Sequence, residues 1–263
     1  MKQSVRELMG FGDDHVPLLK IAKSQKHQQM PVTFPSRKAA QKTIRARSPL
    51  MRDALIHLET NPDVVRIAAY PVRIQYEIAD RYSVIASLDH IPQVDVWTRQ
   101  EQASYFDIIP VCIQQENRWI ASRTSKLKKA FWEEYRATYA VLDENSLHIQ
   151  PRMMNLATIR YHAYRVDEAA VMAVRRALLS VPAQTTVQAI TDAAALPDRA
   201  HVFYNEDGSV AQCRVLTEVK RTFSAVMWLV VEGELKIDLS GPLSPLSAVS
   251  RTTSQIRTDG RAA

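Results

Sequence analysis

The chain has 263 residues, of which 46% are hydrophobic and 24% are charged, and its formal net charge is +6. This composition excludes a disordered or fibrous chain, and the longest apolar stretch (223–231) is far shorter than the ~20 residues that a membrane helix needs. Two cysteines, Cys112 and Cys213, are too few for a disulfide framework or a cysteine-rich zinc site. Because the first residues lack the apolar segment of a signal peptide, we expect a cytoplasmic protein.

Basic residues are concentrated near the N-terminus. Between Lys2 and Arg52 the chain has eleven lysines and arginines against three acidic residues. Residues 1–33 are polar and contain several glycines and prolines, so they predict a basic arm with little core of its own. The strip that follows can track a phosphate backbone, or it can form a solvated face that docks on an acidic partner. Its candidate DNA-binding residues are Arg37, Lys38, Lys42, Arg45 and Arg47.

The pattern of residues 34–150 predicts a small α/β domain. Ser48 and Pro49 are typical of a helix start, and the pair at 61–62 (Asn-Pro) ends that helix. Apolar residues alternate within 64–78, which indicates a half-buried strand. Further expected elements are strands at 82–88, 94–97 and 105–111, a helix at 124–138 and a strand at 139–142.

The helix expected at 124–138 and the residues just before it combine aromatic and basic side chains. Four aromatic residues interleave there with arginines and lysines. Phe131 and Tyr135 are four residues apart, so we expect this pair in the core. The lysines are expected to face DNA or a partner protein. The aromatic residues are Trp119, Phe131, Trp132 and Tyr135.

Residues 151–245 predict a second, smaller domain. Helices are expected at 154–164, 167–179, 185–195 and 216–231, with a hairpin turning at 205–208 (Asn-Glu-Asp-Gly) and a strand at 235–239. Helices followed by a hairpin or strand favour a winged-helix-like module. Residues 246–263 are expected to form a flexible tail. The candidate DNA-binding residues of this domain are Arg175, Arg176, Lys220 and Arg221.

Several segments, taken in order, resemble the TnsA-type endonuclease subunit of heteromeric DNA transposases. Residues 48–53 (SPLMRD) resemble the Ser-x-x-Glu-Arg-Asp helix of that family, and 90–96 (HIPQVDV) fall where it has a (His/Tyr)-x-Pro-Asp strand. Residues 106–110 (FDIIP) fall where it has Glu-Val-Lys-Pro. Shorter similarities lie at 34–38, 57–65, 70–72, 151–155 and 233–239, so the resemblance spans about residues 30–245.

The resemblance implies a restriction-endonuclease-like PD-(D/E)xK core over 34–150 and a winged-helix-like domain over 151–245. In such a core, carboxylates hold one or two divalent ions and a lysine helps to activate the attacking water. At those positions this sequence has Met51, Gln93 and Ile109, and only Asp107 keeps a carboxylate. A single carboxylate does not retain Mg²⁺. We therefore expect no bound metal and no cofactor, with Mg²⁺ required only if the nuclease site is active.

These observations lead to three functional hypotheses. The first is a catalytically inactive, nucleoid-associated DNA-binding and transposase-docking subunit of a mobile-element machinery. Its partners implied by resemblance are DNA, a DDE-type transposase and an ATPase regulator, with no membrane partner. The second is an active metal-dependent DNA endonuclease whose acidic site has migrated to Asp89, Asp95 and Asp107. The third is a DNA-binding regulator or adaptor outside transposition. A nucleotide cofactor is not expected, because the chain lacks a Walker loop and a dinucleotide-binding fingerprint.

Overall fold

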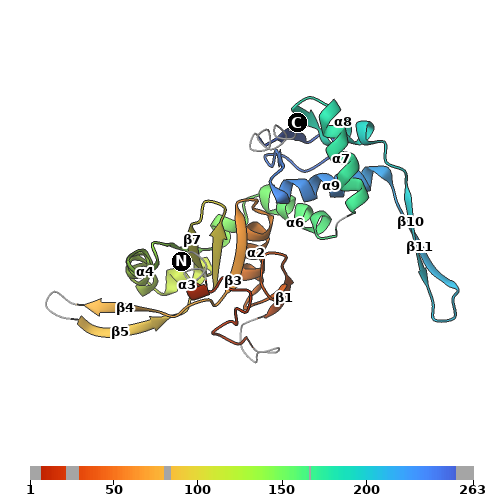
Figure 1. Ribbon diagram of the computed structural model, residues 1–263. Coiled ribbons are helices and arrows are strands. Elements are labelled where there is room, and N and C mark those ends of the chain that lie inside the picture. The colour runs from red at the N-terminus through yellow and green to blue at the C-terminus, as the bar shows by residue number, and fades with distance from the viewer. Residues whose placement is uncertain (1–6, 22–29, 80–83, 166, 253–263) are drawn as a thin grey trace, which may run out of the picture. The chain divides into compact units, whose positions relative to one another are not determined.

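The computed structural model describes residues 7–21, 30–79, 84–165 and 167–252. The chain divides into two compact units, residues 1–149 and 150–263 (Figure 1). Both contain helices and strands, which confirms the mixed α/β character predicted from the sequence. Within the described residues, no helix is both long and apolar enough to cross a membrane.

Unit 1 is built on a four-stranded sheet in the order β3-β6-β7-β8. Strand β6 is antiparallel to both β3 and β7, and β8 runs parallel to β7. The chain crosses from β7 to β8 through α3 (Val111–Glu116) and α4 (Trp119–Tyr135). The strands are β3 (Val64–Ala69), β6 (Val94–Thr98), β7 (Ala103–Ile108) and β8 (Thr138–Leu142).

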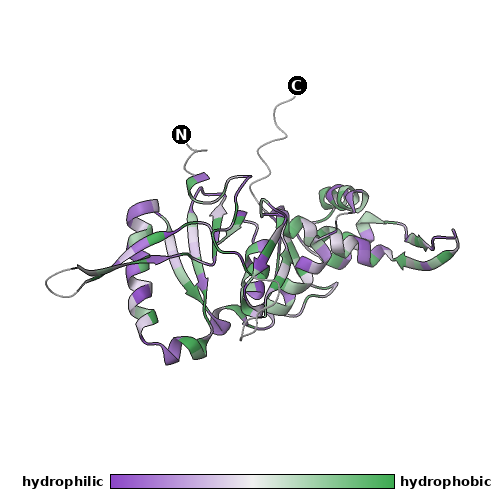
Figure 2. Ribbon diagram, turned by 90° about the horizontal axis from the view of Figure 1, so that it is seen from below, coloured by the Kyte–Doolittle hydropathy of each residue, from purple (hydrophilic) through white to green (hydrophobic). Residues whose placement is uncertain are grey.

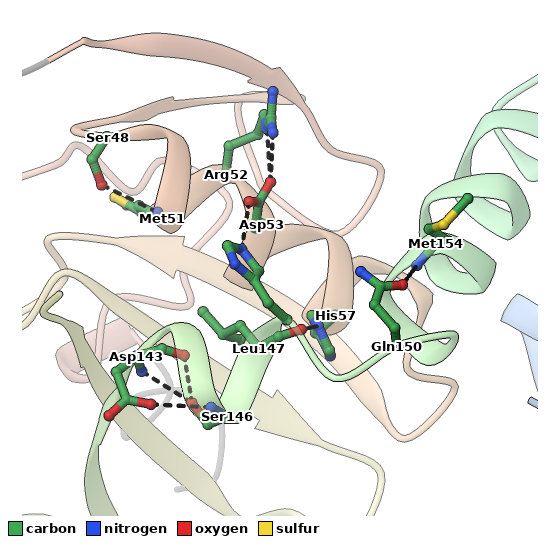
Figure 3. A network of polar contacts seen from close by, with 11 residues as sticks. Ser48, Met51, Arg52, Asp53, His57, Asp143, Ser146, Leu147, Gln150 and Met154 are labelled. Atoms are coloured by element: carbon green, nitrogen blue, oxygen red, sulfur yellow. Dashed lines mark hydrogen bonds and ion pairs between the residues drawn. The ribbon is translucent and has the colours of Figure 1, made fainter. Parts of the chain in front are cut away.

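Helix α2 (Pro49–Thr60) begins where the sequence predicted. The side chain of Ser48 accepts a hydrogen bond from the Met51 backbone at 3.2 Å, as Figure 3 shows. The predicted break at Asn61 is also confirmed, since Asn61 is the C-cap of this helix. On the same helix, Asp53 pairs with its neighbour Arg52, which lies 2.7 Å away. Two further contacts connect α2 to α5 (Glu144–Leu147) and to the residue after it. His148 Nε2 lies 2.9 Å from Asp53 Oδ2, and His57 Nε2 lies 2.9 Å from the Leu147 carbonyl.

Two hairpins flank the sheet of unit 1. The predicted basic strip forms the hairpin of β1 (Val32–Pro35) and β2 (Thr43–Ala46), so its bases do not lie on helical turns. The strand expected over 64–78 is two strands in different sheets. The chain leaves β3 at Tyr70, which has a positive φ of 50°, and then forms β4. The second hairpin pairs β4 (Ile74–Ala79) with β5 (Val84–His90).

The core of unit 1 includes a segment that the sequence analysis assigned to a free arm. Met9 and Phe11 are 2% and 7% exposed, and the Phe11 ring meets Trp97 edge-on at 5.6 Å. Leu18 donates a backbone hydrogen bond to the Tyr70 carbonyl at 3.0 Å. The expectation of an arm with little core is therefore wrong for residues 7–21. Residues 1–6 and 22–29 lie outside the described part of the chain.

Unit 2 packs three helices against a fourth, α9. The C-terminal part of that helix is mostly apolar, and its buried residues include Ala225, Val226, Met227 and Leu229. Asp167 and Thr186 cap α7 and α8. The helices are α6 (Arg152–Ala163), α7 (Glu168–Ser180), α8 (Val187–Ala194) and α9 (Glu218–Glu232).

The strands of unit 2 form a small sheet and a separate hairpin. The sheet order is β12-β13-β9, all antiparallel, with β9 (Gln184–Thr186), β12 (Leu235–Ile237) and β13 (Ala248–Arg251). Because β13 is the central strand, the expectation of a flexible tail from residue 246 is wrong as far as Thr252, and residues 253–263 lie outside the described part. The predicted hairpin is present as β10 (Arg199–Tyr204) and β11 (Val210–Leu216), but it comes between α8 and α9 and projects from the helices (Figure 1).

Candidate functional site

Three of the four positions that the resemblance assigns to nuclease chemistry, those of Met51, Gln93 and Asp107, are linked by contacts in unit 1. Met51 is fully buried in the first turn of α2, and its sulfur is 3.4 Å from the Tyr70 hydroxyl. The backbone of Tyr70 donates a hydrogen bond to the Gln93 carbonyl at 3.1 Å. The backbone of Gln93 in turn lies 3.3 Å from Asp107 Oδ1. This chain of contacts links the start of α2, the end of β3, the start of β6 and the end of β7.

The side chains of the three non-acidic residues at these positions are packed in the interior or bonded to the backbone. The Met51 sulfur also lies 3.3 Å from the Arg47 backbone nitrogen. The Gln93 side chain donates to the carbonyl of Ile108 at 3.2 Å. Ile109 is 9% exposed. None of the three side chains offers a charged group that could bind a metal ion or move a proton.

Asp107 is the one carboxylate at these positions, and it is held by three side chains. It is 2% exposed at the end of β7. The Tyr139 hydroxyl donates a 2.7 Å hydrogen bond to Oδ2, His90 Nε2 lies 3.0 Å from the same oxygen, and Arg123 Nη2 lies 3.5 Å away. These partners come from β8, β5 and α4. We call Asp107, Tyr139, His90 and Arg123 the Asp107 cluster.

Electrostatics in the Asp107 cluster favour the ionised carboxylate. Burial alone would raise the pKa of Asp107, but the contacts with His90, Tyr139 and Arg123 lower it below its usual value. The same carboxylate, together with burial, raises the pKa of the Tyr139 hydroxyl. Burial also raises the pKa of Tyr70 to about 12, and the charges of Arg47 and Asp107 act on it in opposite directions. The tyrosines are therefore neutral hydrogen-bond donors at neutral pH.

This set of donors does not fit a divalent metal ion. Mg²⁺ requires oxygen ligands in near-octahedral arrangement, whereas the site presents a thioether, an amide bound to backbone and one carboxylate already paired with cationic and hydroxyl groups. Across the described residues, no three His, Cys, Asp or Glu side chains are grouped so that they could hold a metal ion.

The three candidate rescue carboxylates have different environments. Asp89 is exposed on the β4–β5 hairpin, where it lies 3.2 Å from Arg73 and 3.1 Å from Gln75. Asp95 is fully buried in the middle of β6, opposite Tyr105 in the strand register. Neither of its oxygens has a hydrogen-bond partner of good geometry, and the Tyr105 hydroxyl is likewise unpaired. Burial raises the pKa of Asp95 well above its usual value, and the nearby backbone of Ala68 offsets only part of that effect.

The loop of the β1–β2 hairpin, which carries the first candidate DNA-binding residues, is anchored on α2. Ser36 and the backbone of Arg37 donate hydrogen bonds of 2.6 and 2.7 Å to the buried carboxylate of Glu59. The anchored loop presents the side chains of Arg37 and Lys42 to solvent. Lys42 has a positive φ of 59° in the turn. These two side chains are the accessible bases of the hairpin.

The other three bases of the strip have contacts within the protein. Lys38 Nζ donates to the Asn61 carbonyl at 2.6 Å, next to the C-terminal end of α2. Arg45 Nη1 donates to Thr33 Oγ1 at 2.6 Å across the hairpin. Arg47 is half-buried near Tyr70. All three are only partly exposed, so they are less accessible to a phosphate than Arg37 and Lys42.

In unit 2 the four candidate DNA-binding residues do not form one basic face. Arg221 is 7% exposed, and its Nε donates to Asp167 Oδ2 at 2.9 Å, so the expectation that it lies with Lys220 on the polar side of the helix is wrong. Arg175 pairs with Glu234 and stacks on Trp228 at 5.5 Å. Only Arg176 and Lys220 are exposed, one on α7 and one on α9.

Sequence reasoning missed the residues that surround Asp107. His90, Arg123 and Tyr139 are between 16 and 32 residues from Asp107 along the chain, so no local pattern connects them to it. The one feature that these residues share in the sequence is chemical, because each side chain can donate a hydrogen bond to a carboxylate. Comparison of the sequence with protein-family models and with curated proteins finds no match for this chain.

Proposed function

We propose that this chain is a TnsA-like, catalytically inactive subunit that binds DNA and docks on a transposase. The observation that carries the proposal is the Asp107 cluster, in which the one remaining carboxylate is paired with Arg123 and contacted by His90 and Tyr139. It lies at the end of β7, where the resemblance puts the catalytic acids. The cluster lacks the lysine and the further carboxylates with which a PD-(D/E)xK core holds a metal ion and its attacking water.

The arrangement of secondary structure supports the same proposal. In unit 1 a helix precedes three antiparallel strands, and a crossover helix leads to a strand parallel to the third. This is the order expected of a restriction-endonuclease-like core. In unit 2 the order α7-β9-α8-α9-β12-β13, with β13 between the other two strands, agrees with a winged-helix-like domain that has the β10–β11 hairpin inserted.

The two units are suited to different partners. Arg37 and Lys42 are exposed on a hairpin anchored to the core, which suits contact with a phosphate backbone. In unit 2, α9 packs against α6, α7 and α8, so it is not free to enter a DNA groove. The β10–β11 hairpin instead exposes apolar side chains, with Val202, Tyr204 and Val210 between 38% and 66% exposed. Such a surface suits a protein partner.

Two measurements on one preparation test the proposal. Supercoiled plasmid is incubated with Mg²⁺ or Mn²⁺ and assayed for nicking, and duplex DNA binding is followed over a salt series. We expect binding without nicking, with an affinity that falls steeply as salt rises. Metal-dependent nicking that is lost in Asp107→Ala would overturn the assignment as inactive.

The contribution of the hairpin is measured with matched variants. Replacing Arg37 and Lys42 together by alanine should lower the slope of log affinity against log salt by about 0.9 for each lost phosphate contact. Lys236→Ala is the control, because Lys236 is exposed on β12 of unit 2. Equal loss of affinity for each charge removed in the two variants would show that the binding is a response to total charge only.

A further inference from the structure

Helix α4 carries two exposed tryptophans, each covered by an arginine one helical turn further along. Trp119 and Trp132 are 55% and 54% exposed. The guanidinium of Arg123 lies 4.9 Å from the centre of the Trp119 ring, and that of Arg136 lies 5.6 Å from Trp132. An exposed indole with a guanidinium over its ring is a recognised interaction geometry, and the repeated pair offers a comparison between two similar sites.

Trp119 is held in a fixed orientation. Its indole Nε1 donates to Asn117 Oδ1 at 3.3 Å, and Arg123 covers the ring while it reaches Asp107. The helix itself is anchored by Leu127 and Phe131, which are fully buried in the core. A ring that is already oriented loses little entropy when it binds a flat ligand. Trp119 therefore has the properties of a stacking platform.

The charges around Trp119 favour a polyanion. From Arg118 to Ala130 the sequence contains five basic residues and no acidic one. Arg123 and Lys126 follow Trp119 at spacings of four and seven residues, which keeps them on the same side of the helix. By contrast, Trp132 is followed immediately by Glu133 and Glu134. The two tryptophans are thirteen residues apart, or about 20 Å along the helix.

We propose that Trp119 stacks on an unpaired base of single-stranded DNA whose phosphates contact Arg118 and Lys126. Stacking on an exposed indole requires a free base face, which a base pair inside a duplex does not present. Trp119 also lies next to the Asp107 cluster through Arg123, so the unpaired base would bind beside the degenerate nuclease site. The inference goes beyond the proposed function, since duplex binding by the β1–β2 hairpin does not require it.

The test uses the full chain and a fluorescein-labelled oligothymidylate of about 12 nucleotides. Binding is followed by anisotropy of the label and by quenching of tryptophan fluorescence. Trp119→Ala should weaken binding by about 5- to 100-fold, the range of one lost stacking contact. Trp119→Phe should restore part of the affinity. Trp132→Ala is the matched control and should bind as the parent does. Circular dichroism confirms that each variant is folded, which is expected because both indoles are more than half exposed.

The outcomes separate this inference from the proposed function. Parent-like binding by Trp119→Ala, or equal loss in Trp119→Ala and Trp132→Ala, overturns the role of Trp119. If duplex DNA binds through Arg37 and Lys42 while oligothymidylate does not bind at all, the inference fails and the proposed function stands. If oligothymidylate binding depends on Trp119 but the hairpin variant binds duplex normally, the inference stands and the proposed duplex contact fails.

Discussion

The hydroxyl of Tyr139 donates a 2.7 Å hydrogen bond to Asp107 Oδ2, which joins the adjacent parallel strands β8 and β7 through their side chains. His90 and Arg123 approach the same oxygen from β5 and α4. The contact therefore connects four elements of unit 1 at one buried carboxylate. Removing one partner of a buried charge is costly, because the charge is then left without compensation.

Replacing Tyr139 by phenylalanine should lower the free energy of unfolding of unit 1 by about 1.5–3 kcal/mol, the usual contribution of a buried hydrogen bond to a charged group. Chemical unfolding followed by circular dichroism measures this change. Tyr204→Phe is the control, because Tyr204 is 66% exposed in unit 2. A loss below about 0.5 kcal/mol would contradict a structural role for the hydrogen bond.

The Asp107 cluster also predicts a response to acid. The folded protein holds the pKa of Asp107 below 3.8, its value in an unfolded chain. As the pH falls through this range, the unfolded chain takes up the proton first, so the stability that is present above about pH 4 is progressively lost. Asp107→Asn should make unfolding less dependent on pH below about 4. An unchanged acid-unfolding curve in this variant would mean that other carboxylates control acid stability.

Asp95 predicts the opposite pH dependence. Burial raises the pKa of Asp95 well above 3.8, so the folded protein keeps a proton that the unfolded chain releases. This contribution to stability is complete below about pH 4 and is lost as the pH rises towards the folded pKa. Asp95→Asn removes the ionisable group and should raise the melting temperature at pH 7 but not at pH 4. Equal shifts at both pH values would show that packing, not ionisation, causes the change.

Local signals in the sequence predicted many of the elements but not all of their boundaries. Ser48 was identified as a helix start because a cap depends only on its own side chain and the next three residues. The break between β3 and β4 was missed because the apolar pattern continues across it, although Pro71 lies in the gap of residues 70–73 and Tyr70 has a positive φ of 50°. The strand β13 was missed for a different reason: it has four residues and is defined by its pairing with β9 and β12.

The candidate site was predictable only in outline. The motif order placed Met51, Gln93 and Asp107 together, and the structure brings them into one chain of contacts. The partners of Asp107 could not be predicted, because Arg123 and Tyr139 reach it through tertiary packing over 16 and 32 residues. Similarly, a helical pattern does not reveal whether a base such as Arg221 meets a buried acid on another helix.

The packing of Phe11 leads to a prediction about the N-terminal segment. Phe11 is 7% exposed and belongs to the same core cluster as Tyr105 and Phe131. Phe11→Ala should therefore destabilise unit 1 by about 3–5 kcal/mol. Leu8→Ala is the control, because Leu8 is 71% exposed and should change stability by less than about 0.5 kcal/mol. If both variants unfold as the parent does, residues 7–21 are an accessory arm after all.

The contacts of Arg221 lead to the last prediction, which separates folding from DNA binding in unit 2. Burial would raise the pKa of Asp167, but the hydrogen bond from Arg221 and the helix-cap bond from Ala170 hold it below its usual value. Arg221→Met leaves that carboxylate without its main partner, so unit 2 should lose about 1.5–3 kcal/mol of stability, the usual contribution of a hydrogen bond to a charged group. Lys220→Met, one residue earlier and exposed, should change stability by less than about 0.5 kcal/mol. DNA affinity measured at a temperature where both variants are folded should then be unchanged by Arg221→Met, and a selective loss there would assign Arg221 to the DNA contact instead.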